Sequence, residues 1–391
     1  MLHYCGLHER EPLCNHKANM RILIAPDKFK GSLSAKEVAA TIAKALHSVD
    51  PEIDVDLFPI ADGGEGTAAI LAQHLGATQK LTQTVDAIGR PIEAESFVGD
   101  RVAILEMSAA SGLWRLKTSE LDPMRASTFG TGIQIRQLID ADLPRILIGL
   151  GGSATSDAGL GMAAAIGYKF YTGDGDPIVP CPARFRDIAV IEPPEIQRFP
   201  EAIGLSDVET KLTGPNGALH TFGPQKGFKP SAIEELDHDL SELVSRIESQ
   251  LGTNFADAPR SGAAGGFGYG IRTFLGGELR SGFDFLAESA KLRDHVLVAD
   301  LVITGEGKLD RQTLQGKGPI GVAAMARECG KPVIAIAGVI EDAEQLAPHF
   351  AKVASLVDQN TSLDDALRDA AGVLYDRVRS LAGMLRSRLN I

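Results

Sequence analysis

The chain has 391 residues, of which 44% are hydrophobic and 23% are charged, so length and composition predict a globular protein of two domains. Its formal net charge of −12 argues against nucleic-acid binding, because an acidic surface repels a phosphate backbone. A few basic groups can still attract a small anionic substrate.

The four cysteines are scattered along the chain, and four are too few to stabilise a chain of this length by disulfides. The longest apolar run, at 333–340, is much shorter than a membrane span. We find no basic-then-apolar signal peptide at the start. These features together predict a cytoplasmic protein.

The first nineteen residues are polar and irregular, and Met20 directly precedes the first strand-like run. We interpret residues 1–19 as an extension ahead of the folded part, either a disordered tail or the product of an upstream start codon. The cysteines and histidines in it match no spacing typical of zinc ligands.

Strands and helices alternate at both ends of the chain. An apolar run at 21–25 predicts a strand, and Ser34 with Glu37 forms a capping box that opens a helix. The other elements expected here are strands at 53–57, 301–304, 333–338 and 353–357, and helices at 67–75, 319–329 and 364–388. Such alternation predicts a parallel sheet with helices on both faces.

The middle of the chain mixes short strands with proline-rich loops. One strand, at 145–150, is followed by a glycine-rich turn and an alanine-rich helix. We therefore predict an α/β fold in which a discontinuous Rossmann-like parallel-sheet domain (20–80 plus 295–391) carries a second, inserted α/β domain (81–294).

The first chemical motif is PDKFKGS at 26–32, directly after the first strand. Ligands bind at the carboxyl edge of a parallel sheet, so we expect Asp27 and Lys30 to face that crevice. An ordinary solvated loop is the alternative.

The second motif is ADGGEGT at 61–67. Asp62 and Glu65 offer the oxygen ligands that magnesium prefers. The paired glycines allow their amides to face an anion. A charged turn that caps the next helix is the alternative.

The third motif is GLGGSATSDAG at 149–159, between a strand and a helix. Small residues let a phosphate approach the backbone, and a helix N-terminus favours anions. The candidates for phosphate binding are Gly151, Gly152, Ser153 and Thr155. A tight turn with a Ser/Thr cap is the alternative.

The fourth motif is TGEGKLDRQTLQGKGPIG at 304–321. Its carboxylates, Glu306 and Asp310, suit metal binding or base catalysis. Its cations, Lys308, Arg311 and Lys317, suit phosphate binding. A structural ion-pair loop is the alternative.

Other enzyme signatures are missing from the sequence. It contains no G-x-x-x-x-G-K-[ST], no G-x-S-x-G and no H-E-x-x-H. A glycine pattern at 159–164 imitates a dinucleotide fingerprint but lacks a clear acidic partner.

The four motifs resemble the hallmark segments of the bacterial glycerate kinase family (type 1, glycerate 2-kinases). Shorter similar segments lie between them in the family's order, and the resemblance covers nearly all of residues 20–391. The chain departs from the family's pattern at Ser156 and Ala158 and in the segment 206–212. The shorter segments are VDAIGRPI (85–92), EMSAASGL (106–113), TFGTG (128–132), FGPQKG (222–227) and SGAAGGFGYG (261–270).

The resemblance implies two α/β domains with the active site in the cleft. It also implies transfer of the ATP γ-phosphate, with Mg²⁺, to (R)-glycerate. The 2-hydroxyl is the expected acceptor, giving 2-phosphoglycerate, and 3-phosphoglycerate is the alternative product. The expected partner is a small molecule, and the oligomeric state is left open between a monomer and a homodimer.

Phosphoryl transfer requires an in-line hydroxyl, a magnesium ion and positive charge on the moving phosphate. We assign Asp62, Asp157 and Asp310 as catalytic candidates, with Asp310 as the first choice for the base. The remaining assignments are Asp27 and Lys317 for the substrate, Glu65 and Glu306 for metal, and Lys30, Gly151, Gly152, Ser153, Thr155, Lys308 and Arg311 for the phosphates of ATP.

Two other classes of function stay open. A phosphatase or a lyase acting on a phosphorylated sugar acid would use a similar acidic cleft but would not consume ATP. A regulator that binds a sugar acid would need a helix-turn-helix with a basic face, and the sequence shows none.

Overall fold

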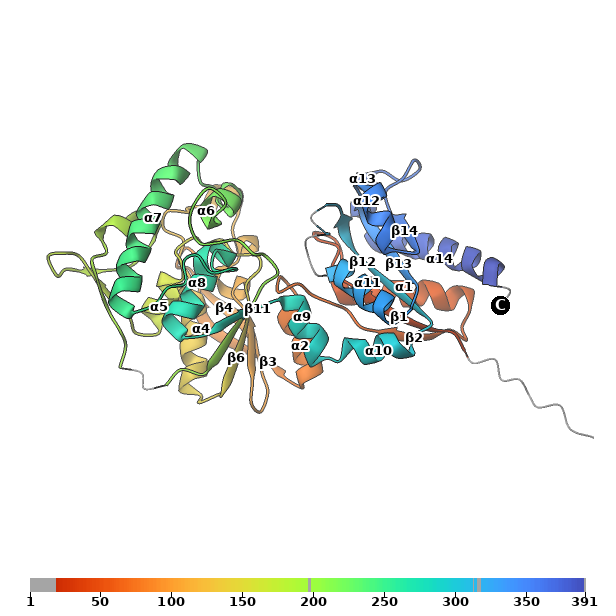
Figure 1. Cartoon of the computed structure of the whole chain (residues 1–391), viewed down its shortest axis with the longest axis horizontal. Coiled ribbons are helices and arrows are strands. Elements are labelled where there is room, and N and C mark those ends of the chain that lie inside the picture. The colour runs from red at the N-terminus through yellow and green to blue at the C-terminus, as the bar shows by residue number, and fades with distance from the viewer. Residues whose placement is uncertain (1–18, 196–197, 312, 315–317, 390–391) are drawn as a thin grey trace, which may run out of the picture.

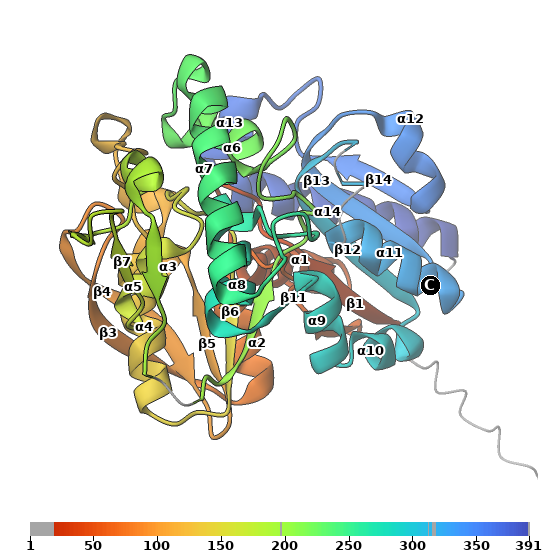
Figure 2. The same ribbon diagram turned by 60° about the vertical axis from the view of Figure 1, so that its left-hand side comes forward.

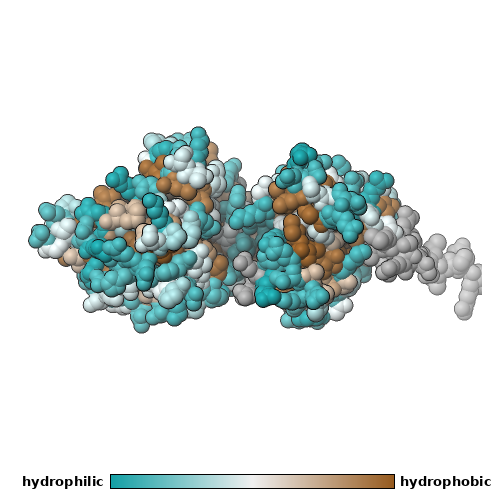
Figure 3. Space-filling view, turned by 90° about the horizontal axis from the view of Figure 1, so that it is seen from above, coloured by the Kyte–Doolittle hydropathy of each residue, from teal (hydrophilic) through white to brown (hydrophobic). Residues whose placement is uncertain are grey.

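The computed structural model describes residues 19–195, 198–311, 313–314 and 318–389. Figure 1 shows two lobes, each built around a β-sheet, and Figure 3 shows them joined at a narrow waist. The model is a mixed α/β structure with parallel-sheet cores, as the sequence predicts.

The first lobe contains a five-stranded sheet in the order β14-β13-β12-β1-β2, in which every neighbouring pair is parallel. The register pairs Ile22 with Leu301, which joins the two ends of the chain side by side. The predicted discontinuous parallel sheet is thereby confirmed. Its strands are β1 (Arg21–Pro26), β2 (Asp54–Leu57), β12 (Leu301–Leu309), β13 (Val333–Ile340) and β14 (Lys352–Ser355).

Helices cover both faces of this sheet. Ile22 and Ile24 of β1 pack in one apolar cluster with residues of α1 (Ala35–Val49) and α14 (Ala370–Leu389). The alternate residues of β1 pack in a second cluster with α10 (Leu292–Val298) and α11 (Gly318–Glu328). This alternation follows from the two-residue period of a strand. The predicted capping box also forms, with the Ser34 hydroxyl accepting from the Glu37 amide.

The prediction of a single helix over 364–388 is wrong in one respect, because the chain forms two helices there. The helix α13 (Leu363–Arg368) ends before Asp369, whose backbone is non-helical, and α14 follows. The Asp369 carboxylate accepts a hydrogen bond from the Gly372 amide at 3.0 Å. Aspartate is favoured at such a helix start because it satisfies a free amide.

The second lobe contains a six-stranded mixed sheet in the order β11-β10-β6-β5-β4-β3. The four strands β11, β10, β6 and β5 run parallel to one another. The strands β3 and β4 form an antiparallel pair at the edge of the sheet. The strands are β3 (Thr78–Val85), β4 (Pro91–Val98), β5 (Ala103–Glu106), β6 (Arg145–Gly149), β10 (Glu201–Leu205) and β11 (Glu278–Arg280).

One face of this sheet packs in an apolar cluster with four helices and with Leu219 of the short helix α6 (Ala218–Phe222). A small antiparallel sheet, in the order β8-β7-β9, adjoins the same cluster. The helices are α4 (Phe129–Asp140), α5 (Leu160–Ala165), α7 (Pro230–Leu251) and α8 (Ala263–Leu275), and the small strands are β7 (Lys169–Tyr171), β8 (Pro177–Ile178) and β9 (Val190–Glu192).

The predicted helix at 67–75 forms as α2 (Thr67–Leu75), and it packs on the other face of the six-stranded sheet beside α9 (Gly282–Ser289). In both views, α9 and α10 follow each other where the lobes meet (Figure 1, Figure 2). These contacts favour a first domain boundary near residue 60 in place of 80. The domain limits themselves stay a prediction.

In the described ranges, every helix falls short of the length or the apolar character that crossing a membrane requires. Cys181 and Cys329 both lie in these ranges, and neither forms a disulfide there.

Candidate active site

The carboxyl ends of the parallel strands of both sheets face one cleft, and the loop 58–66 connects the two sheets. The loop begins against β1, where the Ile60 amide donates to the Pro26 carbonyl at 2.9 Å. It then reaches the second sheet, where the Gly151 amide donates to the Gly63 carbonyl at 3.0 Å. A side chain at Gly63 would place its Cβ 2.4 Å from the Leu205 carbonyl oxygen, so only glycine fits this crossing.

Asp27, Lys28 and Asp62 form a charged group at the end of β1. The Lys28 ammonium lies 3.2 Å from an Asp62 oxygen and 3.6 Å from an Asp27 oxygen. Burial raises the pKa of Asp27 to about 6, although Lys28 opposes the shift. Burial also disfavours the charged form of Asp62, but Lys28 and the Gly64 amide hold its pKa below the usual value.

Lys30, the basic residue predicted to face the crevice, is exposed at the mouth of the cleft, as is Glu65. Both line two adjoining cavities, of about 490 Å³ and about 450 Å³, that together make up the cleft. Trp114, the chain's single tryptophan, lines both cavities too and is 63% exposed.

The glycine-rich loop after β6 lines the cleft with its first residues only. Gly151, Gly152 and Ser153 border the cavity of about 450 Å³, as predicted for a phosphate loop. Thr155 is fully buried, and its hydroxyl has no partner among the described residues. Its predicted contact with phosphate is therefore not supported.

Asp157 is fully buried and does not border either cavity of the cleft. Its carboxylate accepts hydrogen bonds from the Thr128 amide and hydroxyl at 2.8 and 2.9 Å, and from the Gly159 and Gly161 amides at 3.1 Å. Burial nevertheless raises its pKa above the usual value. This arrangement ties the loop to the start of α4 and leaves the predicted catalytic role of Asp157 without support.

The fourth motif places two carboxylates near those of the first two motifs. Burial raises the pKa of Glu306 to about 7, despite a hydrogen bond from Thr313, and the charges of Asp27, Asp62 and Asp310 add to the shift. The Asp310 carboxylate lies 3.3 Å from the Lys308 ammonium. Glu306 therefore lies close enough to Asp27, Asp62 and Asp310 to feel their charges, but neither Glu306 nor Asp310 lines either cavity of the cleft.

The two described cations of the fourth motif, Lys308 and Arg311, line neither cavity of the cleft. Lys308 is exposed and forms ion pairs with Asp310 and, at 2.9 Å, with Glu341. Arg311 lies 3.7 Å from an Asp342 oxygen. Lys317 lies outside the described residues. Both described cations thus form ion pairs, as the alternative interpretation of this motif expects.

Lys28 of the first motif was not assigned from the sequence. Three further charged residues at the cleft were also missed. Glu106 ends β5, accepts from the Ala68 amide at 2.9 Å and has a pKa raised to about 7 by burial. Asp207 follows β10, and burial raises its pKa. Lys226 is buried beside Ser153. Glu106 and Lys226 each lie within one of the shorter family-like segments, and this position was the signal in the sequence that could have identified them.

Of the two predicted metal ligands, Glu306 is influenced by the charges of neighbouring carboxylates, whereas Glu65 is exposed at the mouth of the cleft. In the part of the chain that the structure describes, no three acidic, histidine or cysteine side chains are arranged to hold a metal ion alone. Magnesium, however, is usually bound by one or two carboxylates and by substrate phosphates. Burial is the main cause of the raised pKa of Glu306, and the charges of Asp27, Asp62 and Asp310 add to it, so a cation bound there would offset this negative charge.

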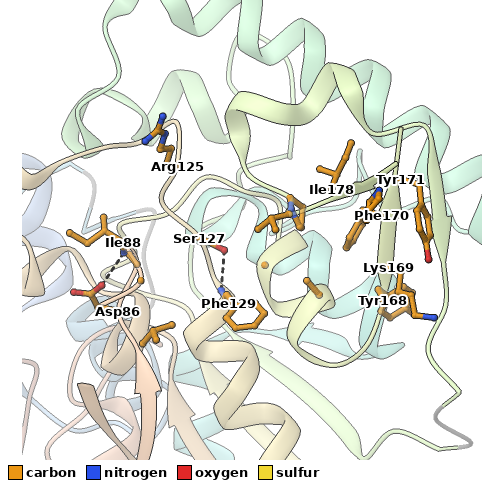
Figure 4. A pocket seen from close by; sticks show the side chains of 18 residues that line it. Asp86, Ile88, Arg125, Ser127, Phe129, Tyr168, Lys169, Phe170, Tyr171 and Ile178 are labelled. Carbon is orange, nitrogen blue, oxygen red and sulfur yellow. Dashed lines mark hydrogen bonds between the residues drawn. The ribbon is translucent and has the colours of Figure 1, made fainter. Parts of the chain in front are cut away.

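A third cavity, of about 480 Å³, lies in the second lobe apart from these motifs (Figure 4). Segments 85–89, 125–129 and 168–180 contribute most of its wall, and Phe129, Phe170 and Ile178 lie on it. None of the predicted site residues lines it.

Comparison with known proteins shows the family of the chain. Residues 22–386 match the model of the glycerate kinase family. The chain is 38% identical to a glycerate kinase of Halalkalibacterium halodurans, covering 92% of this chain and 97% of the relative. It is 37% identical to the glycerate 2-kinase of Escherichia coli, covering 94% and 98%.

A solved structure gives the same result. A crystal structure from Salmonella typhimurium LT2, described as a candidate glycerate kinase 2, superposes with a TM-score of 0.81 at 36% identity, covering 95% of this chain and 100% of that one. The protein therefore belongs to the glycerate kinase family.

Proposed function

We propose that this protein is an ATP-dependent glycerate kinase that transfers the γ-phosphate of ATP to the 2-hydroxyl of (R)-glycerate. The observation that supports it most directly is the cleft, where the ends of β1 and β6 bring hydroxyl, backbone amide, ammonium and carboxylate groups together and where Glu306 of β12 lies close enough to Asp27 to feel its charge. A family match over nearly the whole chain stands beside it.

The groups of the cleft suit phosphoryl transfer, which depends on positioning and on charge stabilisation more than on covalent chemistry. In this proposal Gly151, Gly152 and Ser153 bind phosphate oxygens, and Lys30 adds positive charge at the entrance. Magnesium, held by Glu306 with Asp27 or Asp62, would neutralise charge on the phosphates of ATP.

Asp310 is proposed as the base that accepts the proton of the attacking hydroxyl. It follows β12 at the same sheet edge as Asp27, and Lys308 keeps a positive charge beside it. Glu306 is the second candidate, because a carboxylate with a pKa of about 7 is well matched to proton transfer near neutral pH.

The activity can be tested with purified protein, ATP, Mg²⁺ and (R)-glycerate. We expect ATP consumption that depends on glycerate, and a phosphorus NMR spectrum of the product that matches 2-phosphoglycerate. A spectrum of 3-phosphoglycerate would move the acceptor to the 3-hydroxyl. Hydrolysis of phosphoglycerate without ATP consumption would instead favour the phosphatase alternative.

A further inference from the structure

Lys226 is a charged residue of the cleft to which the proposed mechanism gives no role. It ends a short 3-10 helix (Pro224–Lys226) between α6 (Ala218–Phe222) and α7. Its side chain is only 2% exposed, and no other lysine among the described residues is buried. Lysine is almost never fully buried unless it is paired, so this position calls for a physical reason.

The partners of Lys226 are on the glycine-rich loop. Its ammonium nitrogen, Nζ, donates to the Ser153 hydroxyl at 2.8 Å and to the Thr155 carbonyl at 2.5 Å. No carboxylate of the described residues forms an ion pair with it. The charge of Asp157 favours the ammonium form, but burial outweighs it and lowers the pKa of Lys226 to about 7.

In its ammonium form Lys226 can only donate, so its hydrogen bond then fixes the direction of the Ser153 hydroxyl. Because this oxygen accepts from Nζ, its own proton is free to donate elsewhere. Within the described residues the hydroxyl makes no other hydrogen bond, and both Ser153 and Lys226 border the cavity of about 450 Å³. The backbone of Gly151 and Gly152 borders the same space.

We propose that Lys226 is a positioning residue for oxyanion binding, which turns the Ser153 hydroxyl toward the cavity and supplies the positive charge that holds a phosphate or carboxylate there. This inference rests on the proposed function only in naming ATP and glycerate as the two sources of such a group. Burial of an unpaired ammonium group costs stability, and this role in ligand binding explains why the protein tolerates it.

Proton uptake on ligand binding follows from this arrangement. An oxyanion beside Ser153 favours the ammonium form, so the pKa of Lys226 rises when the anion binds. Above pH 7 the free protein holds this lysine largely neutral, and binding must then take up roughly one proton at this site. Affinity is therefore greatest below pH 7 and decreases as the pH rises.

Other titrating groups surround the same cleft. Asp157 faces Lys226 from the glycine-rich loop, and Asp62 and Asp207 border the same cavity. The start of α8, which also contacts Lys226 at Gly265, carries no charge there. The effect of Lys226 must therefore be measured as a difference between the wild type and a variant without the amine.

Lys226→Met keeps the length of the side chain and removes the amine. Calorimetric titration with ADP, and separately with (R)-glycerate, in two buffers of different ionisation enthalpy at pH 8 measures the protons taken up. Trp114 lines the same cavity, so its fluorescence gives the affinities independently. The matched control is Lys229→Met, three residues further on, which removes the same charge at an exposed position.

We expect Lys226→Met to weaken binding of at least one ligand on the order of 10–100-fold and to take up roughly one proton fewer than the wild type. An effect on ADP alone identifies the phosphate as the oxyanion, and an effect on glycerate alone identifies the carboxylate. Lys229→Met should match the wild type in both measurements.

Ser153→Ala keeps the inference testable if Lys226→Met does not fold. We expect it to weaken the same ligand about 10-fold and to keep the wild-type proton uptake. Unchanged affinity in Ser153→Ala, or equal affinity and proton uptake in folded Lys226→Met, would overturn the proposal. Absence of glycerate phosphorylation by the wild type, with the proton-linked binding of ADP intact, would refute only the proposed function.

Discussion

The charged residues of the cleft are held in surroundings that shift their protonation. Asp27 and Lys226 are 5% and 2% exposed, and Glu106 and Glu306 have pKa values raised to about 7 by burial. Such shifts gather at functional sites, because catalysis near neutral pH needs groups that titrate there. At the scale of single residues, the cleft is therefore the part of this molecule most suited to acid–base chemistry.

Asp310→Asn tests the proposed base. The change keeps the size of the side chain and removes its charge and basicity. Loss of a positioned base costs on the order of 10²–10⁴ in rate, and we expect a loss of that order in turnover of ATP and glycerate. Thermal melting should show that the variant remains folded.

Asp100→Asn is the matched control for this variant, since Asp100 is exposed in the turn between β4 and β5. It should turn over normally. Near-normal turnover by folded Asp310→Asn would contradict the assignment of the base to Asp310 and leave Glu306 as the remaining candidate.

Glu106→Gln tests the burial of a carboxyl group that caps α2. The folded state raises the pKa of Glu106 from 4.5 to about 7, so the wild type loses stability as the pH rises across that range. The amide variant cannot ionise and keeps an oxygen to accept from Ala68. We expect the free energy of unfolding of the variant to be about 1–3 kcal/mol higher than that of the wild type at pH 8 and equal to it at pH 4.

Denaturant titrations at the two pH values measure this difference. Glu93→Gln, at an exposed site on β4, should change stability little at either pH. A Glu106→Gln variant that is less stable than the wild type at pH 8 would show that the ionised carboxylate is a net stabilising group.

At the scale of elements, the cleft depends on loops whose backbones touch. A Cβ at Gly151 would lie 2.4 Å from the Gly64 Cα, so the second and third motifs can meet only through glycine. The backbone of Ser153 also pairs with that of Gly112, which holds the glycine-rich loop against the segment that carries Trp114. Strand ends position these loops, and close backbone contact joins them.

Gly152→Val tests the glycine-rich loop as a ligand site. Gly152 has φ +76°, which costs a side-chain residue about 1–2 kcal/mol, and it borders the cavity. We expect a loss of stability and, in addition, at least a 10-fold rise in KM for ATP or glycerate, because valine occupies space that a ligand oxygen needs.

Gly175→Val separates strain from ligand binding. Gly175 has φ +88° in the turn between β7 and β8, and open space surrounds its Cβ position. It should lose similar stability and keep normal kinetics. Normal kinetics in Gly152→Val as well would mean that the loop has only a structural role.

At the scale of the whole molecule, the two sheets are joined by more than their connecting chains. One apolar cluster includes Val302 from the first sheet, Leu147 and Ile203 from the second, and residues of α9 and α10 between them. The carboxyl edges of both sheets therefore meet across a cleft whose base is packed. This arrangement places residues of the first three motifs around one cleft.

Deletion of residues 1–19 tests how much of the chain this site requires. The first strand begins at Arg21 and the family match begins at residue 22, and residues 1–18 lie outside those that the structure describes. We expect the shortened protein to keep its turnover and its melting temperature. A loss of turnover beyond a few-fold would show that the segment contributes to the site.

The sequence by itself predicted most of the fold and the place of the site. Apolar runs of strand length such as 21–25, the capping box at Ser34, and glycine-rich loops after strands are local patterns, and local sequence specifies them. From these, the parallel sheet formed by both chain ends and the convergence of Asp27, Asp62 and Asp310 at one edge could be predicted.

Only the tertiary structure decided which of these residues face the cleft. The contacts of Asp157 and Thr155 depend on Thr128 and Lys226, which are distant in sequence, so their burial has no local signal. The same is true of Lys226, whose position looks like part of an ordinary polar turn until the chain packs it beneath Ser153. Burial, and with it the pKa of each charged group, is set by long-range packing that no spacing of residues along the chain records.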